Sequence, residues 1–384
     1  MLVRRIAPAA TAAGIAFAHA HRRAHAESSS ATTTNSQVVA AKYAQSLSTS
    51  DGTLYTLPYL DSSKKFSVWR RNGERSSFSE MMAAAQEHDV VLLGETHDDA
   101  IAHKLQEIIF ARLAASRPHV ALSLEMFETD VQHVLDEYLG GLIREQDMRN
   151  DARPWSNYDA HYRPLVEIAK AAGLPVVAAN APRRYVSAAG RDGEIDTRLR
   201  PYPRAAADLP PLPLPAPSAV YTARMHADPE VMPRAVKASD ERVKAAGEKT
   251  PIGEIKLGEG CPYTGFKKGD VLLAPMKLWD CTMAYSVATA LRGGRSAQVV
   301  HVCGSDHSLG IAEFIAHYAS QPIATSSLAA KWPELAASAK RSSGTGPRVL
   351  IINMYPEEDC MAFVEARHAG KCEFVVLTDS PAES

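Results

Sequence analysis

The chain has 384 residues, 46% of them hydrophobic, which is enough to bury one large core or two ordinary ones. A formal net charge of −2 at pH 7 lacks the strongly basic balance typical of nucleic-acid-binding proteins. The cysteines are widely spaced and form no C-x-x-C pair, so they favour reduced thiols over a disulfide framework or a zinc ribbon. They are Cys261, Cys281, Cys303, Cys360 and Cys372.

Residues 1–26 carry four arginines and no acidic residue, which predicts a mitochondrial transit peptide. The alternative is a secretion signal, with an apolar core over Ile6–Ala18 and cleavage after Ala20. Arg22 and Arg23 lie just beyond that cleavage point and fit the transit peptide better. Residues 27–45 are too polar and too low in complexity to pack, so we expect a disordered linker.

The rest of the chain, residues 46–384, alternates strand-like and helix-like runs. Ile101, Leu105, Ile108 and Leu113 recur at helical spacing, for example, in the segment that follows the first strand-like run. This alternation predicts a three-layer α/β domain with a mainly parallel sheet and helices on both faces. No apolar run reaches the roughly 20 residues of a membrane span. The predicted strands cover residues 90–93, 120–124, 175–179, 298–303, 348–353 and 373–377.

A polar, poorly periodic segment over residues 185–270 interrupts this rhythm and predicts an insertion over the strand ends, with some helix. Within it, residues 201–221 read PYPRAAADLPPLPLPAPSAVY. Proline at this density predicts an extended loop or polyproline stretch, because proline removes backbone donors and fixes φ. A docking motif for a partner is the alternative interpretation.

Polar side chains follow four of the predicted strands. In a parallel sheet the carboxyl ends of the strands share one edge, where loops and helix amino termini form the functional crevice. We therefore expect the side chains after these strands to form a cluster. They are Glu95 and His97, then Glu125, then Asn180, and finally Ser305, Asp306 and His307.

Two of these strand ends share the pattern G-x-x-H, at Gly94–His97 and at Gly304–His307. Glycine permits a turn with positive φ that would aim the following residues over the sheet edge. Glu95, His97, Glu125 and His307 are therefore candidate catalytic residues. Imidazole and carboxylate are also ligands of Zn²⁺, Mn²⁺ and Fe²⁺, so His97, His307 and Glu125 are candidate metal ligands.

The competing interpretation is that Thr96, Asp98 or Asp99 caps the following helix while His97 makes a local hydrogen bond. Repetition of the motif, together with Glu125, favours a site, since buried carboxylates and histidines are costly unless they are paired or used.

Other residues are weaker candidates for holding a ligand. Asn180 ends a predicted strand, and His226 of the insertion could reach the crevice, although a surface position is the commoner fate of such a histidine. Tyr158 and Tyr162 could ligate iron or donate a hydrogen bond, or simply pack. Asp280 is interpreted as an amino-terminal helix residue that the helix dipole stabilises.

The order of these motifs resembles the ChaN-type haem-binding domain, within the group that includes the Tiki proteases and erythromycin-esterase-like hydrolases. The resemblance runs from about residue 88 to residue 379. The segments that carry it are GETHDD, LEMF, the Trp155–Leu165 stretch, AANAPR, LWDCTMA, VVHVCGSDHSLG and FVVLTD.

The resemblance implies two different activities. ChaN binds haem through a tyrosine, as paired haems between two subunits, which implies a haem ligand and a possible homodimer here. The Tiki relatives use two G-x-x-H motifs and a glutamate in metal-dependent peptide hydrolysis, and this chain keeps GETH, GSDH and Glu125. It lacks the lipidation cysteine of ChaN.

Three functions therefore stand open. The first is haem binding and iron handling, and the second is a metal-dependent peptidase or esterase. The third is a metal-free acid/base hydrolase in which His97 takes a proton from water and Glu125 orients that water. In each case the partner is haem or a small-molecule or peptide ligand.

Overall fold

The computed structural model describes residues 66–117, 119–192, 196–227, 268–292, 298–320 and 346–379, together with Val38 and Ala40, which are helical. The predicted leader, the remainder of the linker and Cys261 lie outside the described residues. The other four cysteines are buried free thiols, as predicted. Within the described part of the chain, no helix is long and apolar enough to cross a membrane.

The core is an eight-stranded sheet with the strand order β2-β1-β8-β7-β3-β6-β4-β5. The pairs from β8 to β5 are parallel, and β1 is antiparallel to both of its neighbours. All six predicted strands are present, and β1 and β2 were not predicted. The strands are β1 (Phe66–Arg70), β2 (Arg75–Ser76), β3 (Val90–Glu95), β4 (Val120–Glu128), β5 (Val176–Asn180), β6 (Gln298–Gly304), β7 (Val349–Pro356) and β8 (Phe374–Thr378).

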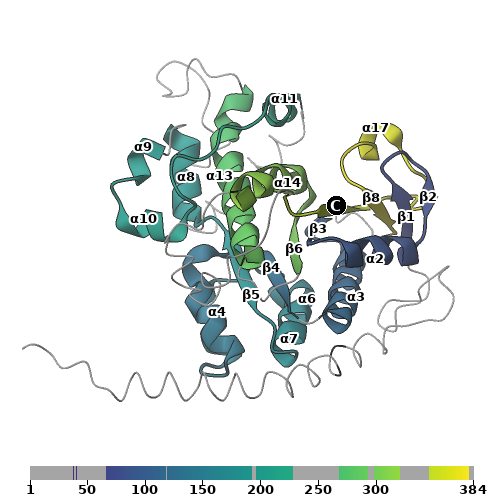
Figure 1. The fold of residues 1–384 in the computed structure, drawn as a ribbon, viewed down its shortest axis with the longest axis horizontal. Coiled ribbons are helices and arrows are strands. Elements are labelled where there is room, and N and C mark those ends of the chain that lie inside the picture. The colour runs from purple at the N-terminus through teal and green to yellow at the C-terminus, as the bar shows by residue number, and fades with distance from the viewer. Residues whose placement is uncertain are drawn as a thin grey trace, which may run out of the picture.

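Helices cover both faces of the sheet, so the predicted three-layer architecture is confirmed (Figure 1). One buried core lies between the sheet and α2 (Phe78–Glu87), α3 (Ala100–Ser116), α4 (Gln132–Leu139), α5 (Glu145–Ala152) and α7 (Arg163–Ala171). The other lies between the sheet and α8 (Arg183–Asp192), α11 (Ala219–Ala227), α13 (Lys268–Arg292) and α14 (Ser305–Ser320). The short elements are η1 (Thr129–Val131), α6 (Tyr158–His161), α9 (Asp196–Leu199), α10 (Pro203–Asp208) and α17 (Glu365–His368).

The strand register places the two G-x-x-H motifs side by side. The sheet pairs β3 with β6, and Glu95 lies opposite Gly304 at the carboxyl ends of these strands. On the other side of β6, Leu124 of β4 lies opposite Val302, which brings Glu125 to the same edge. Parallel pairing therefore gathers residues from distant parts of the sequence at one edge of the sheet.

The proline-rich segment is more helical than predicted. Residues 203–208 form α10, in which Pro203 occupies the first turn, where a missing N–H costs no helical hydrogen bond. Residues 219–227 form α11, so only the part between these helices is non-helical, as expected. Figure 1 shows α8, α9 and α10 as a group of teal helices beyond the β5 edge of the sheet.

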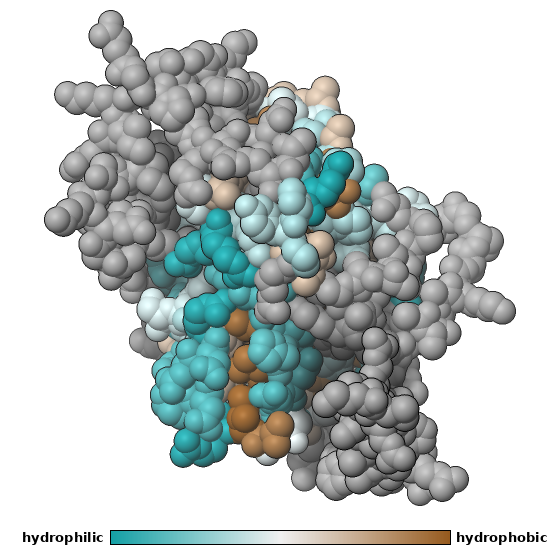
Figure 2. All heavy atoms as spheres, turned by 90° about the vertical axis from the view of Figure 1, so that its left-hand side faces the viewer, coloured by the Kyte–Doolittle hydropathy of each residue, from teal (hydrophilic) through white to brown (hydrophobic). Residues whose placement is uncertain are grey.

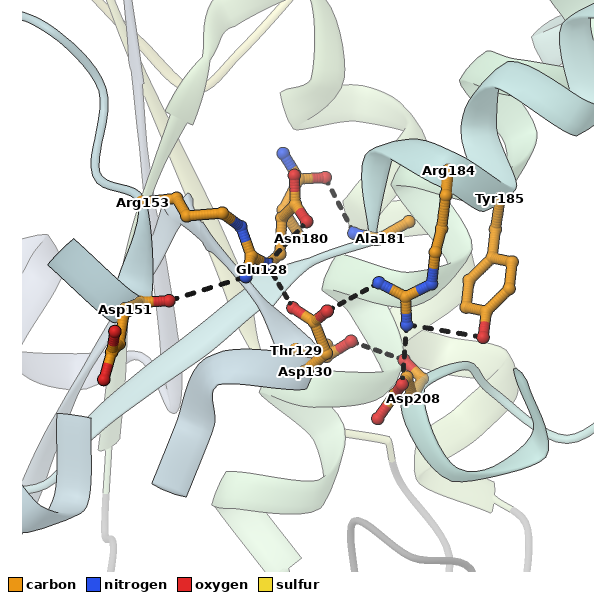
Figure 3. A network of polar contacts seen from close by, with 10 residues as sticks. All are labelled: Glu128, Thr129, Asp130, Asp151, Arg153, Asn180, Ala181, Arg184, Tyr185 and Asp208. Atoms are coloured by element: carbon orange, nitrogen blue, oxygen red, sulfur yellow. Dashed lines mark hydrogen bonds and ion pairs between the residues drawn. The ribbon is translucent and has the colours of Figure 1, made fainter. Parts of the chain in front are cut away.

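A network of ion pairs ties this insertion to the sheet (Figure 3). Arg184 of α8 contacts Asp130 at 2.6 Å and Asp208 of α10 at 3.0 Å. Arg153 contacts the same Asp130 at 2.8 Å and Glu128 at 3.1 Å. Asp130 follows β4, so the carboxylate at the strand end joins the insertion to the loop that carries Arg153.

The outer face of this side of the molecule is mainly polar. Figure 2 shows, on its described part, hydrophilic side chains with a narrow apolar band running between them. A band of this width is ordinary for a protein surface, since scattered apolar side chains are common there.

Candidate functional site

Glu95, the last residue of β3, is a fully buried carboxylate whose two oxygens both accept hydrogen bonds. The Tyr162 hydroxyl donates to Oε1 at 2.6 Å, and Gln106 Nε2 donates to Oε2 at 2.7 Å. Burial raises the pKa of Glu95, but the charge of His103 and the hydrogen bond from His97 outweigh burial and lower it. The carboxylate is therefore held in its charged form inside the protein.

His97 is hydrogen-bonded to this carboxylate and is partly exposed to solvent. Its Nδ1 lies 3.0 Å from Glu95 Oε1, and its side chain is 43% exposed. The His97 carbonyl oxygen accepts hydrogen bonds from Asn157 Nδ2 at 3.1 Å and from His103 Nε2 at 2.9 Å. Burial lowers the pKa of His97, but the Glu95 hydrogen bond and the charge of Glu125 raise it above its ordinary value.

The capping interpretation of this segment also holds. Asp99 caps α3, because its Oδ1 accepts hydrogen bonds from the backbone N–H groups of Ile101 and Ala102, each at 3.0 Å. The GETHDD segment therefore serves two purposes: Asp99 begins the helix, and Glu95 and His97 face the strand ends.

A second buried carboxylate holds the second histidine. Asp280 Oδ1 lies 2.5 Å from His307 Nδ1, and Asp280 Oδ2 accepts a hydrogen bond from the Tyr221 hydroxyl at 2.8 Å. The prediction for Asp280 as an amino-terminal helix residue was wrong. It lies in the interior of α13, fully buried, and is stabilised by His307 and Tyr221 instead of by a helix dipole.

Glu125 lies on β4, on the opposite side of β6 from β3, and contacts both Gly304 and His307. Its Oε2 accepts a hydrogen bond from the Gly304 backbone N–H at 2.7 Å, and its Oε1 is 3.8 Å from His307 Nε2. Burial lowers the pKa of His307, but the charges of Glu125 and Asp280 raise it to about 9. At neutral pH His307 is therefore an imidazolium, because the two carboxylates around it stabilise the charged ring.

Both imidazoles approach the same point beside Gly304. An ideal Cβ on Gly304 would lie 3.1 Å from His97 Cε1, 3.3 Å from His97 Nε2 and 3.6 Å from His307 Cδ2. Neither Gly94 nor Gly304 has a positive φ, so the predicted glycine turn was wrong. Glycine is needed for space: a Cβ on Gly94 would lie only 2.1 Å from Asn353 Oδ1.

Two tryptophans flank the imidazoles edge-on. Trp155 packs against His97 with ring centroids 4.8 Å apart, and Trp279 packs against His307 at 5.7 Å. Both indoles are partly exposed. The mouth of the site therefore has apolar, aromatic sides and a charged floor.

The structure brings together the four predicted catalytic residues, Glu95, His97, Glu125 and His307. Tyr162 joins them through its hydrogen bond to Glu95, whereas Tyr158 is buried and its hydroxyl has no hydrogen-bond partner among the described residues.

Asn180 and His226 are the two remaining candidates for holding a ligand. Asn180 is buried, and its Oδ1 accepts from the adjacent Ala181 N–H. His226 lies in α11, but its side chain is outside the described residues.

The imidazole and carboxylate groups around Gly304 are of the kinds that bind a divalent metal. Each histidine also has its Nδ1 held by a carboxylate, as is common for metal-binding histidines. The placement of these groups does not fit such a metal: among the described residues, no three His, Cys, Asp or Glu side chains are arranged to hold a metal ion. The predicted ligand set of His97, His307 and Glu125 thus stays a prediction.

Sequence reasoning missed the site roles of several residues. Asp280 and Tyr221 lie on helices far from either motif, and Gln106 and Asn157 carry no pattern that distinguishes them from ordinary surface amides. Trp155 precedes Tyr158 in a short aromatic-rich stretch, which was the available signal for an aromatic side of the site.

Comparisons with known proteins give one family match and one similar solved structure. The family model described as "Haem-binding uptake, Tiki superfamily, ChaN" matches residues 81–315. A solved structure titled "Cofacial heme binding to ChaN of Campylobacter jejuni" is similar, with 15% identity, a TM-score of 0.46, and coverage of 84% of this chain and 99% of that one. A search of curated proteins finds no match. Because the family model covers more than half of its length, the chain belongs to the ChaN haem-binding uptake family of the Tiki superfamily.

Proposed function

We propose that this protein is a hydrolase in which His97 is the general base and His307 the general acid. One observation carries the proposal: two imidazoles, each fixed at Nδ1 by a buried carboxylate, approach one point beside the Gly304 backbone. Fixing Nδ1 defines the tautomer, so Nε2 is the atom of each ring that meets the reactants.

The environment gives the two histidines different tasks. In its neutral form, His97 takes a proton from an attacking water at Nε2, and Glu95 stabilises the imidazolium that results. His307 begins as an imidazolium, since its pKa is about 9, and can stabilise and protonate the oxygen or nitrogen that gains charge. Acid/base sites commonly combine one protonated and one deprotonated group in this way.

The geometry also limits what can react at this point. Because an ideal Cβ on Gly304 would lie 3.3 Å from His97 Nε2, a water or carbonyl group held beside Gly304 would be within reach of that nitrogen. Trp155 and Trp279 offer apolar contacts for the substrate outside that space. We infer an ester or amide substrate whose scissile carbonyl reaches Gly304.

The test is an assay of the full chain on ester and peptide libraries, with and without excess chelator. His97→Ala and His307→Ala should each lower the rate by about 100-fold or more, as expected for loss of an acid or base. His133→Ala alters an exposed histidine of α4 and is the matched control. Activity that survives the chelator supports the metal-free route, and activity that chelator removes supports a metal-dependent one. Equal rates in all variants would refute the proposal.

Haem binding is the second candidate, and the family match is the observation that favours it. The tyrosines predicted for haem do not fit as iron ligands. Tyr162 is fully buried and donates to Glu95, and Tyr158 is buried within the core. A buried hydroxyl that already donates to a carboxylate, or lies in the core, is not open to the iron of a macrocycle in this conformation.

A titration of the full chain with haem tests this candidate. A saturable Soret shift that is unchanged by His97→Ala and by Tyr162→Phe would support a haem site away from Gly304. A linear, non-saturable absorbance would count against haem binding.

A further inference from the structure

We propose that Tyr162 and Tyr221 are matched positioning residues, each holding the carboxylate that holds one histidine, so that the insertion helix α11 is part of the site. The chemistry of this inference rests on the proposed function. The two arrangements are Tyr162–Glu95–His97 and Tyr221–Asp280–His307, and they approach Gly304 from different elements.

In both arrangements a tyrosine hydroxyl and a histidine Nδ1 meet one carboxylate, but through different oxygens. Tyr162 and His97 both contact Glu95 Oε1, whereas Tyr221 contacts Asp280 Oδ2 and His307 contacts Asp280 Oδ1. Tyr162 donates to Glu95 at 2.6 Å, and Tyr221 donates to Asp280 at 2.8 Å. Both tyrosines are buried. Burial and the neighbouring carboxylate raise the pKa of each hydroxyl, so each stays protonated and can only donate to its carboxylate.

A glycine on a third helix shows that the second arrangement is closely packed. An ideal Cβ on Gly310 of α14 would lie 1.9 Å from Asp280 Oδ2 and 2.8 Å from Tyr221 Cε2. Tyr221 of α11 and Asp280 of α13 thus both pack against Gly310. Space at Gly310 is what lets α11 contribute its hydroxyl.

The two carboxylates differ in how many donors they accept. Glu95 accepts from Tyr162 and Gln106 as well as contacting His97, whereas Asp280 is contacted by Tyr221 and His307. A carboxylate that shares its charge among more donors stabilises its imidazolium less. This difference suits His97 as the base and His307 as the acid.

His307 also faces other titratable groups, which any test of its titration must hold constant. They are Glu125 of β4, Asp306 of α14, His301 of β6 and His97 after β3. A change confined to the Tyr221 hydroxyl leaves all of these in place.

The experiment compares Tyr162→Phe and Tyr221→Phe in the full chain, with Tyr158→Phe as the matched control. Tyr158 is a buried tyrosine whose hydroxyl has no hydrogen-bond partner among the described residues, so its loss breaks no such bond. Histidine ring signals are followed by NMR against pH without substrate, and His307→Gln and His97→Gln assign them.

We expect the His97 midpoint to rise in Tyr162→Phe and the His307 midpoint to rise in Tyr221→Phe, because each carboxylate then concentrates its charge on the imidazole. Tyr158→Phe should move neither. In hydrolysis, each positioning variant should lower kcat by about tenfold with little change in KM. Midpoints identical to those of the unmodified protein would overturn the inference, whether or not hydrolysis is found.

Gly310→Ala keeps the inference testable if Tyr221→Phe does not fold. The added methyl would lie 1.9 Å from Asp280 Oδ2 and must displace this carboxylate from His307, so the His307 midpoint should fall from about 9 towards its ordinary value. Gly190→Ala in α8 is the control, since a Cβ there meets nothing within 4 Å. An unchanged His307 midpoint in folded Gly310→Ala would also overturn the inference.

Discussion

His97 and His307 belong to motifs more than 200 residues apart in the chain, yet both imidazoles pack against the position where Gly304 lacks a side chain. The contact depends on β3 and β6 being neighbours, with Glu95 opposite Gly304. The two histidines are therefore placed by the sheet register and by the absence of one methyl group.

Gly304→Ala tests this relationship directly. The new methyl would lie 3.1 Å from His97 Cε1, so the ring must move by a few tenths of an ångström or more. The partly exposed ring can swing outward, and we expect hydrolysis to fall by about 10- to 100-fold with only a small loss of stability. Gly190→Ala is the control, and a Gly304→Ala protein with full activity would contradict the shared site.

The pH dependence of hydrolysis should be bell-shaped. Activity should rise as His97 loses its proton, above the ordinary histidine pKa, and fall as His307 loses its own near pH 9. Glu125→Gln removes a charge that raises the pKa of His307, so the alkaline limb should move to lower pH. Initial rates between pH 5 and about 10.5 measure both limbs, and a single ascending limb would show that no acid is needed.

The fold was predictable because its strands are continuous apolar runs. All six predicted strands exist, since a parallel strand buried on both faces must be apolar throughout. The strands β1 and β2 escaped prediction because β2 has only two residues and β1 lies towards the edge of the sheet.

The site was predictable only where its residues adjoin a strand. Glu95, His97, Glu125 and His307 follow apolar runs, so the topology of a parallel sheet implies their meeting. Asp280 and Tyr221 meet His307 through the packing of three helices, so no strand end predicts where they lie. The sequence analysis assigned Gly304 to a turn, whereas the structure needs a glycine there for space. The sequence shows that a glycine is present but does not show which side chain packs against it.

Stability should depend on pH through His307. Its pKa is about 9 when folded and about 6.5 when unfolded, so its contribution is fully present below pH 6.5 and is lost as the pH rises through 9. The difference corresponds to at most about 3 kcal/mol. Urea unfolding at pH 6.5 and 9.5 should show a larger alkaline loss for the unmodified protein than for His307→Gln. Parallel losses would mean that the imidazolium is not stabilised by folding.

Ion pairs attach the insertion to the carboxyl end of β4. Asp208 ends α10, where a negative charge opposes the helix dipole, yet it is completely buried. Arg184, whose side chain is 45% exposed, compensates this charge at 3.0 Å and also contacts Asp130 (Figure 3). Asp208→Ala therefore removes the ion pair between α10 and α8 while leaving Arg184 paired with Asp130 at the strand end.

We expect Asp208→Ala to lower the free energy of unfolding by about 1–3 kcal/mol, because solvent screens the half-exposed arginine. Cleavage by a limited amount of protease should increase within residues 183–208, since α10 loses its link to α8. Asp151→Ala is the matched control: Asp151 takes part in the same network only through its backbone oxygen, which the substitution keeps. If both variants are cut at the same rate, Arg184 and Asp208 do not hold the insertion in place, and its attachment rests on the apolar contacts of α8 and α11 with α13.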